Sequence, residues 1–141
     1  MGVLMRFDPA LALQTVIRGR LIAAGDVLAL VPADSILDVT GRPERVPAVI
    51  IGEGQTVFRR FDSTTHATLH VWAKEPGLVT SKAIASAIVN ALASDAQIDG
   101  VVALNGFTCH DLRVSQTLFM RDQHGSFSHG VVSVAAIVKA N

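Results

Sequence analysis

Apolar residues first recur with the spacing of a helix. Asp8 followed by Pro9 forms an N-cap with proline in the first turn. Apolar residues then return every three or four positions, which predicts a helix over 9–24. The segment 26–32 adds one short helical turn that Pro32 ends.

A second stretch of helical spacing lies in the middle of the chain, over 78–94. Its polar residues fall four positions apart, which places them together on one face of a helix. The opposite face is apolar and rich in alanine, so it can approach a sheet closely. The apolar face comprises Ile84, Ile88, Ala91 and Leu92, and the polar face comprises Lys82, Ser86 and Asn90.

Strand patterns fill the region between these two helices. Residues 35–39 read as a weak strand, and the β-branched run 48–53 reads as a buried one. From Ala67 to Ala73 every second residue is apolar, which predicts a strand with one face in the core. The polar segment 52–65 is either one long loop or the exposed extension of a hairpin.

The last third of the chain predicts a long hairpin. Residues 99–104 form a short strand, and polar and apolar residues then alternate to Arg121. The segment 122–126 is the turn, and alternation resumes up to the C-terminus. In the first long strand, the residues expected on one face are Leu112, Val114, Leu118 and Met120.

This order of elements predicts an α+β fold. We expect a mostly antiparallel sheet of about four to five strands, with two helices packed on one face and the long hairpin at the C-terminus. The other sheet face is neither apolar nor strongly charged, and mixed faces of this kind often meet another subunit. It carries His66, His70, Trp72, Arg113, Ser115 and Thr117.

Composition points to a protein that associates with copies of itself. The chain has 141 residues, about one domain's worth, of which 50% are hydrophobic and only 17% are charged. Apolar or neutral surface is therefore left over, and oligomerisation would cover it. Twelve basic residues balance twelve acidic ones, which argues against strong nonspecific binding of nucleic acid.

The sequence predicts a protein made in the cytoplasm, with no membrane partner. The single cysteine, Cys109, allows no disulfide within the chain. The N-terminus lacks the uninterrupted apolar run of a signal peptide, because Arg6, Asp8 and Pro9 break it. No stretch approaches the ~20 apolar residues of a membrane span.

No pattern in the chain predicts a catalytic, cofactor-binding or metal-binding residue. On a strand, His66 and His70 lie about 13 Å apart, whereas metal ligands must converge on one ion. The other histidines are scattered, and Cys109 and His110 point to opposite faces of their strand. The "GEGQ" segment lacks the lysine of a phosphate loop and the helix that would follow it.

Several polar and aromatic residues are candidates for contacts between subunits. Two segments, 52–65 and 121–130, read as projections, and the first is either a solvated loop or an arm that pairs with a neighbour. Trp72 is either covered by a helix or an interface anchor. The candidates are Arg59, Arg60, Asp62, His70, Trp72, Arg113 and His124.

Three quoted segments and their order resemble a known family. "VPAVIIGE", "LHVWAKEPG" and the alanine-rich helix "AIASAIVNAL" follow the first amphipathic helix and precede the long hairpin. The arrangement resembles the tail completion proteins of long-tailed phages, also called tail terminator or tail-to-head joining proteins. The similarity covers nearly the whole chain, so it implies one tail-terminator-like domain over 1–141.

The resemblance implies a structural role in a virion and no enzymatic activity. Such proteins form a ring, commonly a hexamer, at the head-proximal end of the tail tube, where they stop its growth. The implied partners are further copies of the chain, the tail tube protein and a head-completion or connector protein. DNA passes through the ring without specific binding, and no cofactor is involved. Prophages and gene transfer particles contain such proteins as well.

Two alternatives remain open from the sequence. One is a neck or connector-adapter protein on the head side of the joint. The other is a small oligomeric ligand-binding or enzymatic α+β domain. That alternative requires titratable groups that converge between subunits, for example Arg113 with Glu53 or Asp111.

Overall fold

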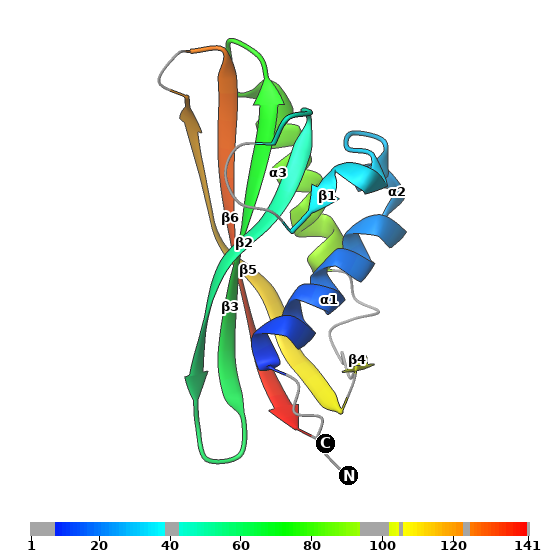
Figure 1. Cartoon of the computed structure of the whole chain (residues 1–141), viewed down its shortest axis with the longest axis vertical. Coiled ribbons are helices and arrows are strands. Elements are labelled where there is room, and N and C mark those ends of the chain that lie inside the picture. The colour runs from blue at the N-terminus through cyan, green and yellow to red at the C-terminus, as the bar shows by residue number, and fades with distance from the viewer. Residues whose placement is uncertain (1–7, 39–42, 94–101, 105, 123–124, 141) are drawn as a thin grey trace.

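The computed structural model describes residues 8–38, 43–93, 102–104, 106–122 and 125–140, except for the side chains of 102–104 (Figure 1). The helices are α1 (Pro9–Ala23), α2 (Gly25–Leu28), the 3-10 turn η1 (Ala33–Ser35) and α3 (Val79–Leu92). The strands are β1 (Ile36–Leu37), β2 (Ala48–Phe58), β3 (Ser63–Lys74), β4 (Val102–Leu104), β5 (Phe107–Arg121) and β6 (Phe127–Ala140). Both long predicted helices are confirmed to within two residues at each end.

All described strands belong to one sheet in the order β1-β2-β3-β6-β5-β4. Four strands are long, and the two border strands have only two and three residues. Neighbours are antiparallel except for β1 and β2, which are parallel. The α+β class and the C-terminal hairpin, now β5–β6, are confirmed.

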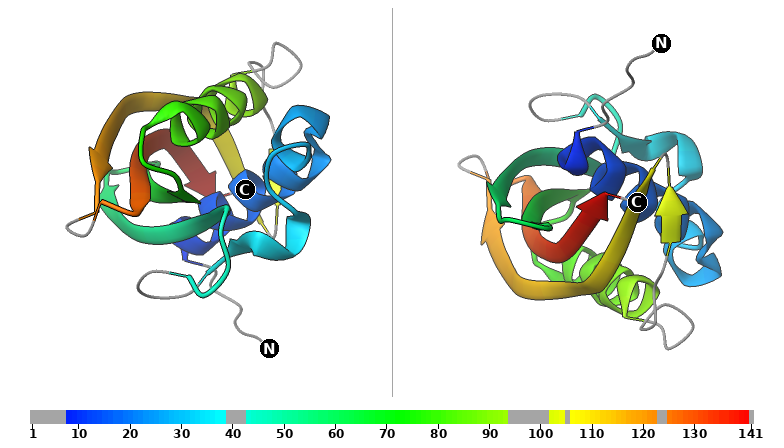
Figure 2. Two further views of the ribbon diagram at one scale, coloured as in Figure 1. Left: turned by 90° about the horizontal axis from the view of Figure 1, so that it is seen from above. Right: turned by 90° about the horizontal axis from the view of Figure 1, so that it is seen from below.

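The core lies between one sheet face and the helices. Every second residue of β3, from Ala67 to Ala73, is at most 7% exposed, as the alternation predicts. On the helix side, Leu13 and Ile17 of α1 and Ile84 of α3 are fully buried against this face. Figure 2 views the molecule along its long axis and shows the strong twist of the sheet. Among the described residues, no helix is long and apolar enough to cross a membrane.

The polar segment 52–65 is the exposed extension of a hairpin, so the loop alternative is wrong. β2 continues to Phe58 and pairs with β3 from Ser63 onward, after a β-bulge between Ile51 and Gly54. Glycine is required in the bulge because the strands approach closely there. A Cβ on Gly54 would lie 2.7 Å from the His66 carbonyl oxygen.

The predicted alternation in β5 is only half correct. The register shifts between His110 and Arg113 and again between Val114 and Gln116. After the second shift, Thr117 pairs with the buried Val132 and so lies on the helix side of the sheet. The predicted face assignments of Leu118, Met120 and Thr117 are therefore wrong, because each β-bulge adds a residue and exchanges the faces.

Candidate functional site

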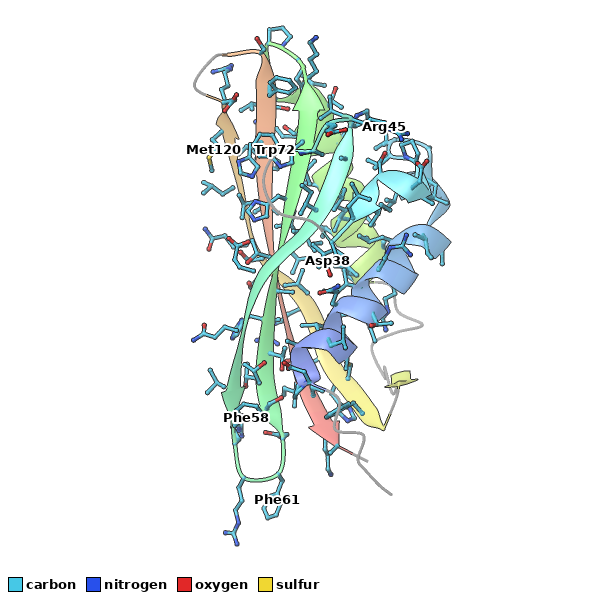
Figure 3. The ribbon with its side chains drawn as sticks, in the orientation of Figure 1. Asp38, Arg45, Phe58, Phe61, Trp72 and Met120 are labelled. Atoms are coloured by element: carbon cyan, nitrogen blue, oxygen red, sulfur yellow. The ribbon has the colours of Figure 1, made fainter. Side chains whose placement is uncertain are left out.

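The sheet has two ends, and exposed apolar side chains gather at both. We call the end formed by residues 58–62, together with the starts of α1 and β5 and the end of β6, the tip end. We call the opposite end, formed by residues 74–81, 118–122 and 125–129, the turn end. Figure 3 shows Phe58 and Phe61 at the tip end and Met120 at the turn end of the elongated molecule.

A tight, ordered turn presents two phenylalanines at the tip end. The Arg59 backbone N–H donates to the Asp62 carbonyl at 2.8 Å, and Arg59 Nε lies 3.2 Å from Asp62 Oδ1. The Arg60 guanidinium stands 5.2 Å from the centre of the Phe61 ring. Phe58 and Phe61 are nonetheless 73% and 75% exposed. The turn therefore holds its own shape while both rings face outward.

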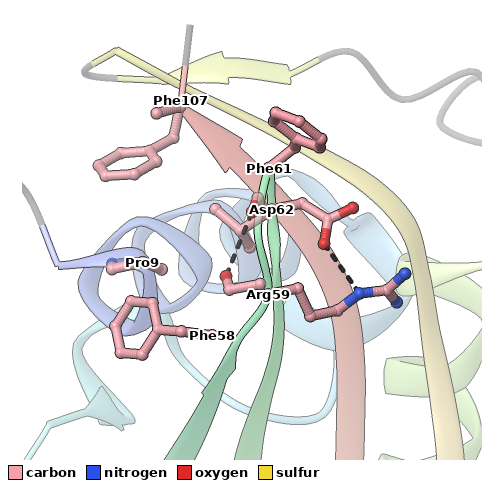
Figure 4. A pocket seen from close by; sticks show the side chains of 9 residues that line it. Pro9, Phe58, Arg59, Phe61, Asp62 and Phe107 are labelled. Atoms are coloured by element: carbon pink, nitrogen blue, oxygen red, sulfur yellow. Dashed lines mark hydrogen bonds and ion pairs between the residues drawn. The ribbon is translucent and has the colours of Figure 1, made fainter.

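An open pocket of about 150 Å³ lies beside this turn (Figure 4). It brings together the hairpin tip, the first residue of α1 and the adjoining ends of β5 and β6. Its apolar lining consists of Pro9, Phe58, Phe61, Phe107, Val138 and Ala140. The tip end is thus an aromatic surface with a hollow, in which Arg59 and Asp62 supply the polar rim.

One carboxylate organises the turn end. Glu75 accepts hydrogen bonds from the backbone N–H groups of Thr80 and Ser81 at 2.9 and 3.0 Å, and from Ser128 Oγ at 2.7 Å. Desolvation acts to raise the pKa of Glu75, but these hydrogen bonds together outweigh it and lower the pKa. Glu75 thereby fixes the start of α3 to the start of β6.

Three large apolar residues are exposed at the turn end. Val79, the first residue of α3, is 78% exposed. Leu118 and Met120 of β5 are 48% and 38% exposed. They lie on the sheet face away from the helices, because they pair with Val131 and His129 of β6.

A hydrogen-bonded chain of Glu53, His70 and His129 lies on that same sheet face. His70 Nε2 lies 2.6 Å from Glu53 Oε1, and His70 Nδ1 lies 2.8 Å from His129 Nε2. The His129 ring stacks on Trp72 with a centroid distance of 4.0 Å and an angle of 8°. The chain therefore joins β2, β3 and β6 across the sheet face opposite to the described helices.

The electrostatics of this chain favour a neutral His129. Burial lowers the pKa of His129, and the adjacent His70 lowers it further. The hydrogen bond from His70 lowers the pKa of Glu53. A single proton bridges the two rings, so protonating both facing nitrogens would break the 2.8 Å contact.

The chain can hold protons, but the described residues give it no partner for chemistry. Among the described residues, the rings of His70 and His129 form no hydrogen bond with a serine or threonine hydroxyl or with a cysteine thiol. No group of three or more histidine, cysteine, aspartate or glutamate side chains in the described ranges could hold a metal ion. Cys109 is buried, and desolvation raises the pKa of its thiol.

The predicted interface residues fall into three separate groups. Arg59, Arg60 and Asp62 share the tip end, as the predicted projection requires. His70 and Trp72 come together through His129. Within the described part of the chain, the helices lie on the other face of the sheet and do not cover Trp72.

The third group is Arg113, whose Nη1 contacts Asp111 Oδ2 of the same strand at 2.6 Å. The remaining predicted residue, His124, lies outside the described residues.

Phe58, Phe61 and His129 are not among the residues predicted from the sequence, and Glu53 was predicted only as a possible partner of Arg113 between subunits. Phe58 and Phe61 were hidden in a segment that reads as polar, although two aromatics flanking Arg59-Arg60 are a signal in themselves. His129 pairs directly with Trp72, a contact that depends on the register of β3 against β6. Glu53 reaches His70 only because of the bulge.

Comparison with known proteins gives one family and one fold. The family model described as "Tail completion protein gp17" matches residues 15–139. Among solved structures, a chain of "Virion of native gene transfer agent (GTA) particle" is similar, with a TM-score of 0.77 and 19% identity. The alignment covers 96% of this chain and 100% of that one. No curated protein matches in sequence.

Proposed function

This chain belongs to the tail completion protein gp17 family, and on that premise we propose that it forms a ring at the head-proximal end of a phage-type tail tube. Membership confirms the family predicted from the sequence and makes the protein a structural component of a phage tail, hence of a virion. The finer proposal is that the ring ends growth of the tube and joins the tail to the head.

The observation that carries this proposal is the presence of apolar surface at both ends of one elongated molecule. Phe58 and Phe61 are exposed at the tip end, and Val79 and Met120 at the turn end. Burying a large apolar side chain against a partner contributes roughly 1.5–3 kcal/mol. A protein held between a tube below and a head above needs such a surface at each end.

Charge supports passage of DNA through the proposed ring. The chain carries no net charge at neutral pH. Each phosphate that a protein neutralises adds affinity for DNA, so a neutral ring lets DNA slide where a basic ring would hold it. The proposed role needs no cofactor, because the subunits contact each other, the tube and the head without covalent chemistry.

The test replaces the two aromatics of the tip end. The double variant Phe58→Ser, Phe61→Ser removes apolar surface that the folded subunit leaves exposed, so its thermal unfolding should match that of the wild type. We expect particles that assemble with this variant to show tails without heads or with abnormal length in negative-stain images. The matched control is Leu28→Ser, Leu30→Ser, which alters two side chains, each 38% exposed, in and just after α2.

Joined particles with normal tails in both variants would overturn the proposed role of the tip end. Defects in the α2 control alone would assign tail joining to the flank of the subunit. Light scattering on the wild-type protein tests the ring itself, since six copies of 14.9 kDa give about 89 kDa.

A further inference from the structure

The sheet has two long free edges. β1 covers the outer edge of β2 only at Val49 and Ile50, and β4 covers β5 only over 107–109. Among the described residues, no strand pairs with the outer edge of β2 over 51–58 or of β5 over 110–121. A free strand edge presents unpaired backbone N–H and C=O groups, which pair readily with another strand.

The directions of the two edges suit each other. Three antiparallel steps separate β2 from β5, so the two strands run in opposite directions. A second copy whose β2 lies beside β5 therefore continues the sheet with the same antiparallel geometry. The two edges are different surfaces, so each subunit uses one edge toward each neighbour, which is the head-to-tail contact that a closed ring requires.

Opposite charges mark the two edges at nearly the same height. One row of paired residues crosses the sheet through Gln55, His66, Ala135 and Arg113. Glu53 precedes Gln55 by two residues on β2, and its bond to His70 places its carboxylate on the same sheet face. If a copy of β2 lies beside β5 at the same height, Glu53 of that copy lies two residues along the strand from the row that contains Arg113.

Within one subunit these two side chains cannot meet. They stand on opposite borders of four strands, and three strand spacings amount to about 14 Å. Both remain accessible, because the Glu53 side chain is 72% exposed and the Arg113 side chain is 49% exposed. Glu53 is the only charged residue on the free edge of β2 over 51–58.

We propose that neighbouring subunits join by pairing the β5 edge of one with the β2 edge of the next, and that Arg113 and Glu53 form an ion pair across this seam. The seam rests on the ring proposed above and identifies its interface. The bond to His70 fixes the Glu53 carboxylate on this sheet face, and Asp111 fixes the guanidinium of Arg113.

The test exploits the head-to-tail character of the seam. In a subunit with Arg113→Glu, every seam sets two carboxylates against each other, and in one with Glu53→Arg, every seam sets two guanidinium groups together. We expect either variant alone to need at least about tenfold higher concentration for half-assembly, measured by light scattering. In an equal mixture, alternating subunits restore an opposite charge at every seam, so assembly should return.

Matched controls carry the same charge changes elsewhere. Lys82→Glu lies on the exposed face of α3, and Glu44→Arg lies in the loop before β2. Each should assemble like the wild type, alone and mixed. The Glu53→Arg variant also loses the bond to His70. This loss cannot account for rescue when it is mixed with the Arg113→Glu variant, because the Glu53→Arg subunits still lack the bond in the mixture.

The outcomes separate the seam from the ring. Rescue by mixing supports the seam, whereas variants that assemble normally, or that fail alone and mixed, overturn it and leave the ring proposal in place. If the wild-type chain stays monomeric at every concentration and in the presence of tail tubes, the ring proposal fails and the seam fails with it.

Discussion

Replacing Glu75 by alanine should loosen the turn end by a predictable amount. The substitution removes the acceptor for the first N–H groups of α3, and losing such a cap costs about 1 kcal/mol. It also leaves the hydroxyl of Ser128, a fully buried residue, without its partner, which costs about 1 kcal/mol or more. Because the carboxylate is partly solvated, we take about 1 kcal/mol for each of the two effects. The expected loss in the free energy of unfolding is therefore about 2 kcal/mol.

Urea unfolding at neutral pH and thermal unfolding measure this loss. At roughly 2–4 °C per kcal/mol, Tm should fall by about 4–8 °C. Glu75→Gln keeps one acceptor oxygen and should lose about half as much. Glu44→Ala removes an exposed carboxylate and should stay within about 0.5 kcal/mol of the wild type. If Glu75→Ala also stays within that margin, the hydrogen bonds of this carboxylate do not stabilise the fold.

Three further changes have defined outcomes. Gly54→Ala forces a Cβ against the His66 carbonyl and should cost about 1–3 kcal/mol in urea unfolding, whereas Gly77→Ala, which meets no atom within 4 Å, should cost far less. The fold holds the pKa of His129 below its ordinary 6.5, so the unfolded chain binds a proton that the folded chain does not. Stability is therefore full above pH 6.5 and falls as the pH drops below it, and His129→Gln should flatten this dependence. Arg20→Met should leave the stability unchanged or higher, because Nη1 of the buried Arg20 has no hydrogen-bond partner among the described residues.

The helices and the core face of β3 follow from local pattern alone. The cap at Asp8 is real, since the Ala10 N–H donates to its carboxylate at 2.8 Å. Ile84, Ile88 and Leu92 are buried along α3 as their spacing requires. Such patterns succeed because helix and strand periods are properties of the backbone, and one apolar face is enough to orient each element.

The errors came from features that depend on two segments at once. The bulge after Val114 exchanges the faces of the following residues in β5, and its signature is a register against β6 rather than a sequence motif. The bulge at Gly54 likewise turns Glu53 toward His70. A bulge is defined by the register between two paired strands, so it cannot be recognised in one strand alone. Alternation therefore predicted that β5 is a strand, but not which of its residues lie on which face of the sheet.

The long helices and strands and the α+β class follow from the sequence alone, because they depend on periodicity and on residues near one another in the chain. The family follows from the resemblance of three segments and their order along the chain. Which surfaces the protein offers depends on the tertiary structure. Phe58 and Phe61 come to one end, and Val79 and Met120 to the other, because four long strands run the length of the molecule. Pairing of β3 with β6 brings His129 to Trp72. Among the described residues, the short border strands β1 and β4 leave most of the outer edges of β2 and β5 unpaired. These surfaces come from contacts distant in sequence, which local spacing does not encode.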